Sequence, residues 1–445
     1  MSLLSRIREK FTSFQIIIIA FVSVIILGAF LLVLPVSSAD HSTTSFWTAL
    51  FTSTSAICVT GLVVCDTATY WSYFGQFVIL SLIQIGGLGV VTVASFITML
   101  AGRKIGLMQR QIMQNALSAP QVGGIVRLTR FILITSFSIE MIGALLLLPV
   151  FVPMFGARGI WLSVFHSISA FCNAGFDLMG RNTGEFSSLT SFAADPYLTT
   201  VIAILIITGG FGFISWSDIA TKRFDIKAYR LQTKIIMSTT LALIVIPCIF
   251  FFVFCFDGHP LKERLCLSFF QAVTPRTAGF NTADLSAIPE AGILMTMVLM
   301  LIGGSPGSTA GGMKTTTTAV LFGNIVAVFR RRPNANFYGR RVDDTLVKSA
   351  SAIFSMYVTL AVFAALFISI NEDLPILTCL FETFSAIGTV GLSLGITTKL
   401  SHISYTVLIL LMFLGRVGGL TIMYAAFSHR DLSTSKYPVE NIMIG

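Results

Sequence analysis

The hydrophobicity pattern of the chain consists of long apolar runs that recur from one end to the other. Seven runs of roughly 20 residues are each long enough to cross a hydrocarbon core of about 30 Å as a helix. They cover residues 14–34, 77–100, 128–150, 198–213, 235–256, 350–370 and 405–427. The pattern predicts an all-α, polytopic membrane protein with almost no part outside the bilayer.

Four shorter apolar segments between these runs share one pattern. In each, a Phe stands ten residues before a Gly, and Leu or Phe follows the Gly: Phe51 and Gly61, Phe165 and Gly175, Phe269 and Gly279, Phe381 and Gly391. Three copies also carry Ser-Ala at the same offset (Ser55, Ser169 and Ser385), whereas the third copy has Val273-Thr274. One such glycine alone would be an ordinary packing or turn residue, but four copies in matched register indicate an internal repeat.

The apolar part of each repeated segment is only about 12 residues long, which is too short to span and predicts a re-entrant helix. Non-helical backbone at membrane depth is tolerated only when it is buried in protein or faces water. We therefore expect four span, pore-helix, span units around one pseudo-fourfold pore, with eight transmembrane helices and four re-entrant helices. The units are residues 1–110, 111–228, 229–345 and 346–445.

This arrangement favours a cation. The C-terminal end of a helix carries about half a negative charge, so four short helices pointing to mid-membrane would attract a partly hydrated cation. The chain that returns outward could present backbone carbonyls in place of the water shell of the ion. Glycine suits such a turn because it accepts positive φ and lets backbones approach closely.

Composition agrees with a membrane location, since 55% of residues are hydrophobic and only 11% are charged, with a mean hydropathy of +0.86. A net charge of +9 would suit a nucleic-acid binder, but 21 of the 29 Lys and Arg residues fall on one side when the runs alternate across the membrane. These 21 lie in segments 1–13, 101–130, 217–234, 329–348 and 429–445. The bias predicts a multi-pass protein of the cell membrane with both termini cytoplasmic and no nucleic-acid partner.

The first apolar run follows a basic start, as in a signal peptide, but it is too long for a usual h-region and more spans follow. We expect it to be an uncleaved first helix. The seven cysteines form no C-x-x-C pair. We therefore expect neither a disulfide framework nor a transition-metal site.

An interruption distinguishes the second span of the third unit. Between the apolar stretches 293–302 and 319–329 lie ten residues with five glycines and a proline, which cannot continue a helix: Gly303, Gly304, Ser305, Pro306, Gly307, Ser308, Thr309, Ala310, Gly311 and Gly312. This segment, called the gating loop below, should line a water-filled cavity. A flexible polar segment placed there could block a pore in one conformation and clear it in another.

Charged residues inside the predicted spans are costly and are treated as functional by default. Arg416 lies in the last span and could repel ions or bind the carbonyls of the gating loop, or it could snorkel to the surface. Lys314, directly after the loop, has the same two interpretations. Glu140 is expected to make a structural polar contact between helices. Gly-Gly pairs at 86–87, 209–210, 303–304 and 418–419 are expected to be close-packing or hinge points.

The four repeated units resemble those of the Trk/Ktr/HKT superfamily of cation transporters, most closely the Ktr potassium-uptake membrane subunits of the KtrB type. The resemblance covers residues 14–430 and rests on four filter strings: Val59, Thr60 and Gly61; Asn173, Ala174 and Gly175; Thr277, Ala278 and Gly279; Thr389, Val390 and Gly391. It implies that carbonyls of these residues bind the transported potassium ion, because glycine at all four positions goes with potassium and serine in the first goes with sodium. It also implies that the gating loop and Arg416 form the permeation barrier. Pro275-Arg276 departs from the apolar pair of the other repeats, and Arg276 would put a charge beside the pore mouth.

The function expected from these residues is potassium-selective, channel-like uptake driven by the membrane potential. An alternative is an ion-coupled secondary transporter, such as a sodium/potassium symporter with a midplane site, although such folds usually show two-fold repeats. An enzyme is not expected, because the five His residues include no H-E-x-x-H pattern. The segment near Lys314 misses the phosphate-binding pattern G-x-x-x-x-G-K-[ST] by one residue, so no cofactor is expected to bind this chain.

Nucleotide regulation would then come from another chain. The resemblance implies a homodimer in the lipid bilayer, with a separate KtrA-like cytosolic ring of the RCK type that binds ATP or ADP. The basic segments 217–234 and 329–348 are candidate docking surfaces for the ring, or simply lipid-facing charges. The tail 436–445 could contact the second protomer.

Overall fold

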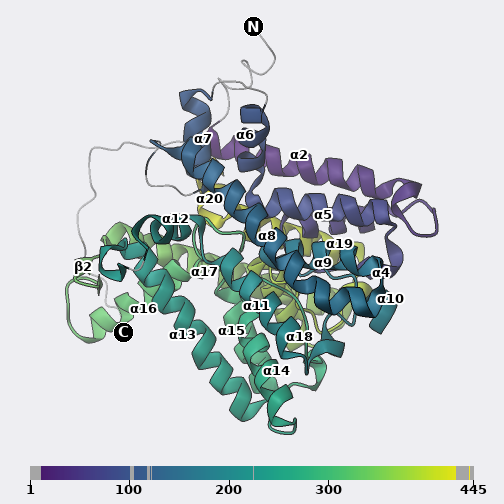
Figure 1. Ribbon diagram of the computed structural model, residues 1–445. Coiled ribbons are helices and arrows are strands. Elements are labelled where there is room, and N and C mark those ends of the chain that lie inside the picture. The colour runs from purple at the N-terminus through teal and green to yellow at the C-terminus, as the bar shows by residue number, and fades with distance from the viewer. Residues whose placement is uncertain are drawn as a thin grey trace.

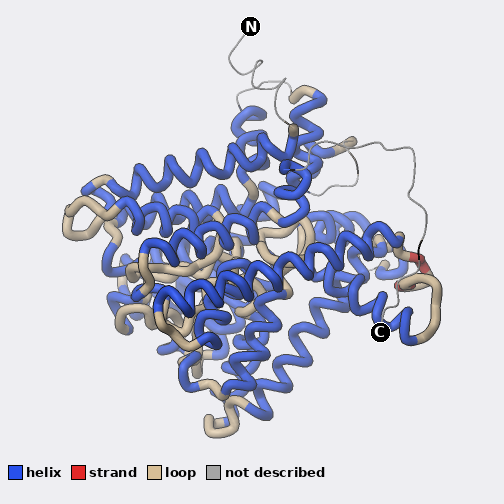
Figure 2. The backbone as a smooth tube through the Cα atoms, turned by 180° about the vertical axis from the view of Figure 1, so that it is seen from behind, coloured by secondary structure: helices blue, strands red, loops and turns tan. Residues whose placement is uncertain are grey.

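The structure is a computed structural model that describes residues 12–100, 105–117, 121, 123–223, 225–426 and 440. The basic start (Arg6, Arg8 and Lys10) and, apart from residue 440, the tail 436–445 lie outside these residues. Within them the chain is almost entirely helical (Figures 1 and 2). The prediction of a helical polytopic protein is confirmed.

Four long helices have the length and apolar composition needed to cross a membrane: α2 (Ser13–Val33), α8 (Ile125–Phe155), α13 (Leu231–Phe254) and α17 (Asp344–Glu372). Each is followed by a short helix that packs against it: α3 (Phe46–Ile57), α9 (Arg158–Phe171), α14 (Leu261–Val273) and α18 (Ile376–Gly388). Two of the long helices begin at a residue whose side chain caps the first turn, namely Thr12 for α2 and Asp343 for α17. Thr12, for example, caps α2 through a capping box with Gln15.

Each short helix is followed, after a loop, by a helix that breaks part-way. The pairs are α5 (Tyr73–Leu88) with α6 (Val90–Leu100), α11 (Pro196–Gly210) with α12 (Phe213–Lys222), α15 (Glu290–Leu301) with α16 (Thr315–Phe329), and α19 (His402–Val417) with α20 (Gly419–Ala426). The first two pairs each bend by 94°. The sequence led us to expect continuous helices over the apolar runs 77–100 and 405–427, but in the structure both runs are broken. The breaks fall at Gly89 and Gly418, whose φ angles of 87° and 89° cannot occur inside an α-helix.

The remaining elements connect these helices. They are α4 (Thr67–Tyr70), α7 (Leu107–Leu117), α10 (Gly180–Thr183), the 3₁₀ turns η1 (Pro35–Ser37), η2 (Thr190–Phe192), η3 (Ile226–Ala228), η4 (Leu285–Ala287) and η5 (Thr397–Lys399), and a hairpin of β1 (Asn336–Phe337) and β2 (Arg340–Arg341). The hairpin follows α16 and lies at one side of the molecule, beside the ends of α12 and α16 (Figure 1).

The core lies where the four short helices and the loops that follow them meet. Phe51, Phe165, Phe270 and Phe381 are all at most 1% exposed, whereas outward residues of the long helices are open. Leu241 of α13 is 64% exposed and Phe363 of α17 is 67% exposed. This exposed apolar belt over the long helices suits a lipid environment. The polar loops that follow the short helices lie inside it, at the centre of the molecule.

Candidate functional site

The loops that follow the four short helices share one unusual backbone conformation. The first residue of each predicted filter string has positive φ, and so does the glycine two positions later: Val59, Asn173, Thr277 and Thr389, then Gly61, Gly175, Gly279 and Gly391. Positive φ is uncommon outside glycine and is an outlier for a β-branched residue such as Val59. Four such outliers at matched positions mark these loops as a site where the surrounding structure imposes the conformation.

The four glycines approach one another in a closed ring. A side chain at each would come within 3.0 Å of the carbonyl oxygen that precedes the next glycine: Gly61 meets Ala174, Gly175 meets Ala278, Gly279 meets Val390 and Gly391 meets Thr60. The order runs from the first loop to the fourth and back to the first. No residue but glycine fits at any of the four positions without displacing a neighbouring backbone.

The ring opens into a cavity of about 230 Å³ that all four glycines line. Asp66 and Asp177 are among the other residues of its wall. The Asp66 carboxylate accepts hydrogen bonds from the backbone N–H of Ala68 at 3.1 Å and Phe186 at 3.1 Å, which ties the wall to a loop of the next repeat. The cavity is therefore polar and carries carboxylates where it opens.

Hydroxyl groups on the short helices hold the loops in place. Ser55 Oγ accepts from Gly61 N at 3.1 Å and Ser385 Oγ from Gly391 N at 3.0 Å. In the other two copies the hydroxyl donates to the carbonyl after the glycine: Ser169 to Phe176 O and Thr274 to Phe280 O, both at 2.7 Å. In sequence the hydroxyls share one offset in three copies, and Thr274 of the third copy lies one position later; the structure shows that all four hold a loop.

The gating loop lies on the other side of the ring, between α15 and α16. It is latched to its neighbours by backbone hydrogen bonds: Ser305 N donates to Gly210 O (2.9 Å), Thr309 N to Gly209 O (3.2 Å) and Gly312 N to Gly415 O (3.2 Å). Gly311 and Gly303 lie against the side chains of Thr389 and Thr277, which begin two of the filter strings. The loop therefore covers the ring from the side opposite the 230 Å³ cavity.

Thr309 joins the gating loop to the second filter string. Its hydroxyl, which is fully buried, lies 2.9 Å from Phe171 O at the end of α9 and 3.3 Å from Asn173 Oδ1. Gly209 faces all three of these groups, because a side chain there would touch each of them. The loop and the filter string are thus parts of one hydrogen-bonded unit.

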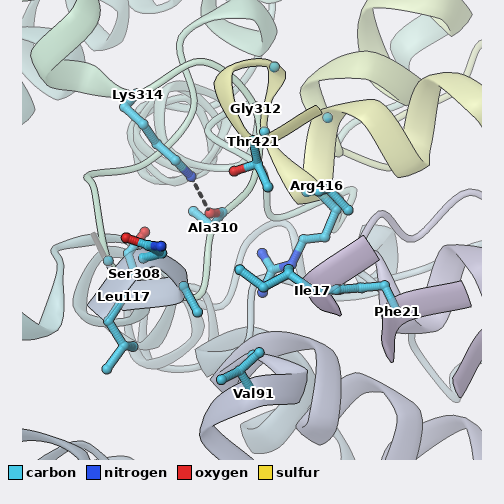
Figure 3. Close-up of a pocket in the computed structure, with 18 of the residues that line it drawn as sticks. Ile17, Phe21, Val91, Leu117, Ser308, Ala310, Gly312, Lys314, Arg416 and Thr421 are labelled. Atoms are coloured by element: carbon cyan, nitrogen blue, oxygen red, sulfur yellow. Dashed lines mark hydrogen bonds between the residues drawn. The ribbon is translucent and has the colours of Figure 1, made fainter. Parts of the chain in front are cut away.

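Both cations predicted near the loop turn toward it. Lys314 Nζ donates to Ala310 O (2.8 Å) and Gly311 O (3.3 Å), and Arg416 donates to Thr309 O, to Gly86 O and, at 3.2 Å, to Gly87 O. They line a cavity of about 240 Å³ that also includes Leu117 and Ser308 (Figure 3). The interpretation of these two residues as snorkelling to the surface does not fit, because each finds its hydrogen-bond acceptors in the interior.

The glycine pairs of the broken helices lie at close contacts or breaks, as expected, but the pair 418–419 is not the structural counterpart of the first two pairs. Gly86, Gly209 and Gly415 each lie against the final carbonyls of a short helix, those of Ile57, Phe171 and Ile387. Gly415 is thus the counterpart of Gly86, and Gly418 is the counterpart of the break at Gly89. It follows that Arg416 occupies the position that Gly87, Gly210 and, by sequence, Gly304 hold in the other broken helices.

Two further predicted residues lie in the interior. Glu140 of α8 accepts from Gln84 Nε2 of α5 with both carboxylate oxygens, at 2.9 and 3.1 Å, and from Cys172 Sγ at 3.9 Å, which confirms the expected polar contact between helices. Arg276 precedes Thr277 and is 5% exposed. It stands where Cys58, Cys172 and Gly388 end the other short helices, at the end of the string that faces the gating loop. Arg276 is not among the residues that line the 230 Å³ cavity, so it does not put a charge at that opening.

Comparison with known proteins places this geometry in a family. The family model described as "Cation transport protein", TrkH, matches residues 7–434. The chain belongs to the TrkH cation transport family. It is 40% identical to the potassium/sodium uptake protein NtpJ of Enterococcus hirae, with 99% of each chain covered, and 40% identical to the Ktr system potassium uptake protein B of Bacillus subtilis, with 98% of this chain and 97% of that protein covered.

The fold has a counterpart among solved structures. The crystal structure of the potassium transporter TrkH from Vibrio parahaemolyticus aligns with a TM-score of 0.72 and 18% sequence identity, covering 92% of this chain and 83% of that one. The family and its fold establish a multi-pass membrane cation transporter.

Proposed function

We propose that the protein mediates potassium uptake across the cell membrane through one pore per chain, in a channel-like manner. The observation that carries this proposal is the closed ring of four glycines, which lines one cavity on one side and is covered by the gating loop on the other. Backbone carbonyls converging on an axis, with four helix C-termini behind them, suit a partly dehydrated monovalent cation. The named relatives in Bacillus subtilis and Enterococcus hirae support potassium as that cation.

In this proposal the chain is built from four units, residues 1–110, 111–228, 229–345 and 346–445, each a span, a pore helix and a broken span. The filter is formed by residues 59–61, 173–175, 277–279 and 389–391. The gating loop, Lys314 and Arg416 form the barrier. With both termini cytoplasmic, the 230 Å³ cavity is the outer mouth. No cofactor is needed for transport itself.

The driving force would be the membrane potential. Moving one charge through 100 mV is worth about 2.3 kcal/mol, so a potential of ~150 mV supports accumulation of roughly a few hundred-fold without ATP hydrolysis by this chain. Nucleotide control by ATP or ADP would come from an RCK-type cytosolic ring bound to a homodimer of the membrane subunit. The name "Ktr system" carried by relatives supports a multi-subunit assembly.

The test is Gly61→Ser, assayed as ⁸⁶Rb⁺ and ²²Na⁺ uptake into proteoliposomes. A side chain at Gly61 would meet Ala174 O, and its φ of 89° is unfavourable for serine, so the first string must shift. We expect the ratio of potassium to sodium uptake to fall by about tenfold or more. Gly156→Ser is the matched control, since Gly156 has positive φ but open space around it and is not among the residues that line the two cavities. An unchanged ratio in Gly61→Ser would overturn the filter assignment.

A second candidate is sodium/potassium symport. The two helix pairs bent by 94° and the printed name of the Enterococcus hirae relative favour it. The two mechanisms differ in their coupling to sodium. With equal potassium on both sides and zero potential, symport predicts that an inward sodium gradient drives potassium uptake. Channel-like uptake predicts no net potassium movement under the same condition.

A further inference from the structure

An apolar groove lies at the start of α13, away from the ring and the gating loop. Its volume is about 690 Å³, and its walls come from the end of α11 and the first turns of α13: Ile207, Phe211, Met237 and Leu241. Leu241 is 64% exposed, so the groove opens on the outer face of a helix that crosses the membrane. Apolar side chains at this place face lipid tails.

Two lysines stand at the rim of this groove. Lys227 of η3 is exposed, and Lys234 of α13 is half-buried, with its Nζ donating to Lys227 O at 2.8 Å. That hydrogen bond holds the Lys234 ammonium beside the backbone of Lys227. No acidic side chain is among the residues that line the groove.

The neighbouring cations are used differently. Lys222 forms a salt bridge with Asp218 at 2.9 Å, and Arg230 lies 4.0 Å from the same carboxylate. In the part of the chain that the structure describes, Lys227 and Lys234 have no such partner. Asp225, the acidic residue nearest to Lys227 in sequence, accepts hydrogen bonds from the backbone N–H of Lys227 (3.1 Å) and Ala228 (3.3 Å), which fixes η3.

We propose that this groove binds an acidic phospholipid, with its anionic headgroup on Lys227 and Lys234 and an acyl chain along the apolar wall. Two unpaired ammonium groups above a lipid-facing apolar groove match the two parts of such a molecule. A soluble anion would leave the apolar wall uncovered, and a neutral lipid would leave both charges unpaired. Basic pockets between transmembrane helices are suited to anionic headgroups.

The occupied groove would tie α11 to α13 and η3. Gly209 and Gly210, which accept hydrogen bonds from the gating loop, lie between the wall residues Ile207 and Phe211, so bound lipid would stabilise the neighbourhood of the gating loop as well. The binding itself depends neither on the ion transported nor on the role of the filter, so its test is separate from that of the proposed function.

The experiment compares phosphatidylglycerol with phosphatidylcholine, added to delipidated full-length protein and counted by native mass spectrometry. We expect wild type to retain phosphatidylglycerol in preference, and Lys227→Gln/Lys234→Gln to bind it roughly 25-fold more weakly, about fivefold for each amine. Leu241→Trp should reduce binding by filling the groove without changing charge. Arg330→Gln/Lys348→Gln removes two exposed cations outside the groove and should bind as wild type does.

Three results would overturn the proposal. The first is equal retention of the two lipids by wild type. The second is loss of binding in the Arg330→Gln/Lys348→Gln control as large as in the Lys227→Gln/Lys234→Gln variant, since the effect would then be general surface charge. The third is unchanged phosphatidylglycerol binding in the Lys227→Gln/Lys234→Gln variant. If that variant also loses its response to a cytosolic partner, the surface serves protein docking instead.

Discussion

Thr309→Val tests whether the gating loop is held in place by the filter itself. Valine has nearly the shape of threonine but cannot donate, so the change removes the hydrogen bond to Phe171 O and the polar contact with the Asn173 side-chain amide. The other latches, such as the donation of Ser305 N to Gly210 O, stay intact. The perturbation therefore weakens the covering position of the loop without introducing a clash.

The magnitude follows from burial. Thr309 is 0% exposed, so water cannot replace the lost donor while the loop is in place. Phe171 O keeps the Asn173 side-chain amide as a donor at 3.2 Å, so the change removes one buried hydrogen bond, worth about 0.5–1.5 kcal/mol. When the loop moves away, that carbonyl can be hydrated and the cost is recovered. At about 1.4 kcal/mol per tenfold, the ratio of displaced to covering loop should rise by roughly twofold to tenfold.

The assay is ⁸⁶Rb⁺ uptake into potassium-loaded proteoliposomes without a cytosolic partner. We expect Thr309→Val to raise the initial rate several-fold, whereas Thr309→Ser, which keeps the hydroxyl, should behave as wild type. Size-exclusion profiles and melting temperatures of all three proteins establish that folding is unchanged. A rate at or below the wild-type value in folded Thr309→Val would refute the idea that this contact keeps the loop over the ring.

Three further substitutions probe the same centre. Arg416→Gln removes the cation that binds a loop carbonyl, so we expect faster ⁸⁶Rb⁺ uptake; slower uptake would show that Arg416 supports conduction rather than closure. Gly209→Ala should reduce the free energy of unfolding by about 1–3 kcal/mol, seen as a lower melting temperature, because the new side chain would overlap three groups. Gly210→Ala has room for its side chain and should melt near wild type. Glu140→Gln should keep a hydrogen bond with Gln84 and melt near wild type, while Glu140→Ala should melt lower; equal melting of both would mean that the contact contributes nothing.

Much of the helical architecture could be predicted from hydropathy, but the breaks could not. The runs that became α2, α8, α13 and α17 are long and uninterrupted, so the predicted and observed helices agree closely. The runs 77–100 and 405–427 are equally apolar, and a hydropathy average does not register the positive φ of Gly89 or Gly418. Glycine is also common inside transmembrane helices, so its presence alone does not reveal a break.

The residues of the candidate site were found from sequence because they repeat, whereas their contacts were not. A Phe and a Gly at a fixed offset identify all four strings, yet the order in which the strings meet depends on packing between residues more than 100 positions apart. Arg416 illustrates the limit: it was picked out as a buried charge, but its acceptors are Thr309, 107 positions away, and Gly86, 330 positions away. Arg276 shows the same limit: counting charges by loop assigns a side to the whole loop, whereas Arg276 itself is absent from the wall of the 230 Å³ cavity.

Two of the four broken helices depart from the pattern of the others, and in the proposed function these departures form the barrier. In the first and second broken helices the residue after the close-packed glycine is Gly87 or Gly210, and a side chain at Gly87 would strike Cys172 Sγ at 2.6 Å. Only the fourth helix has an arginine there, and only the third is opened into a loop whose carbonyls can accept from it. Neither departure would be stable alone, because a buried guanidinium needs acceptors and an unwound segment at membrane depth needs donors. We therefore expect the loop and Arg416 to act as one unit, so that the effects of Thr309→Val and Arg416→Gln on uptake should be less than multiplicative when combined. Fully multiplicative effects would mean that the two residues close the pore independently.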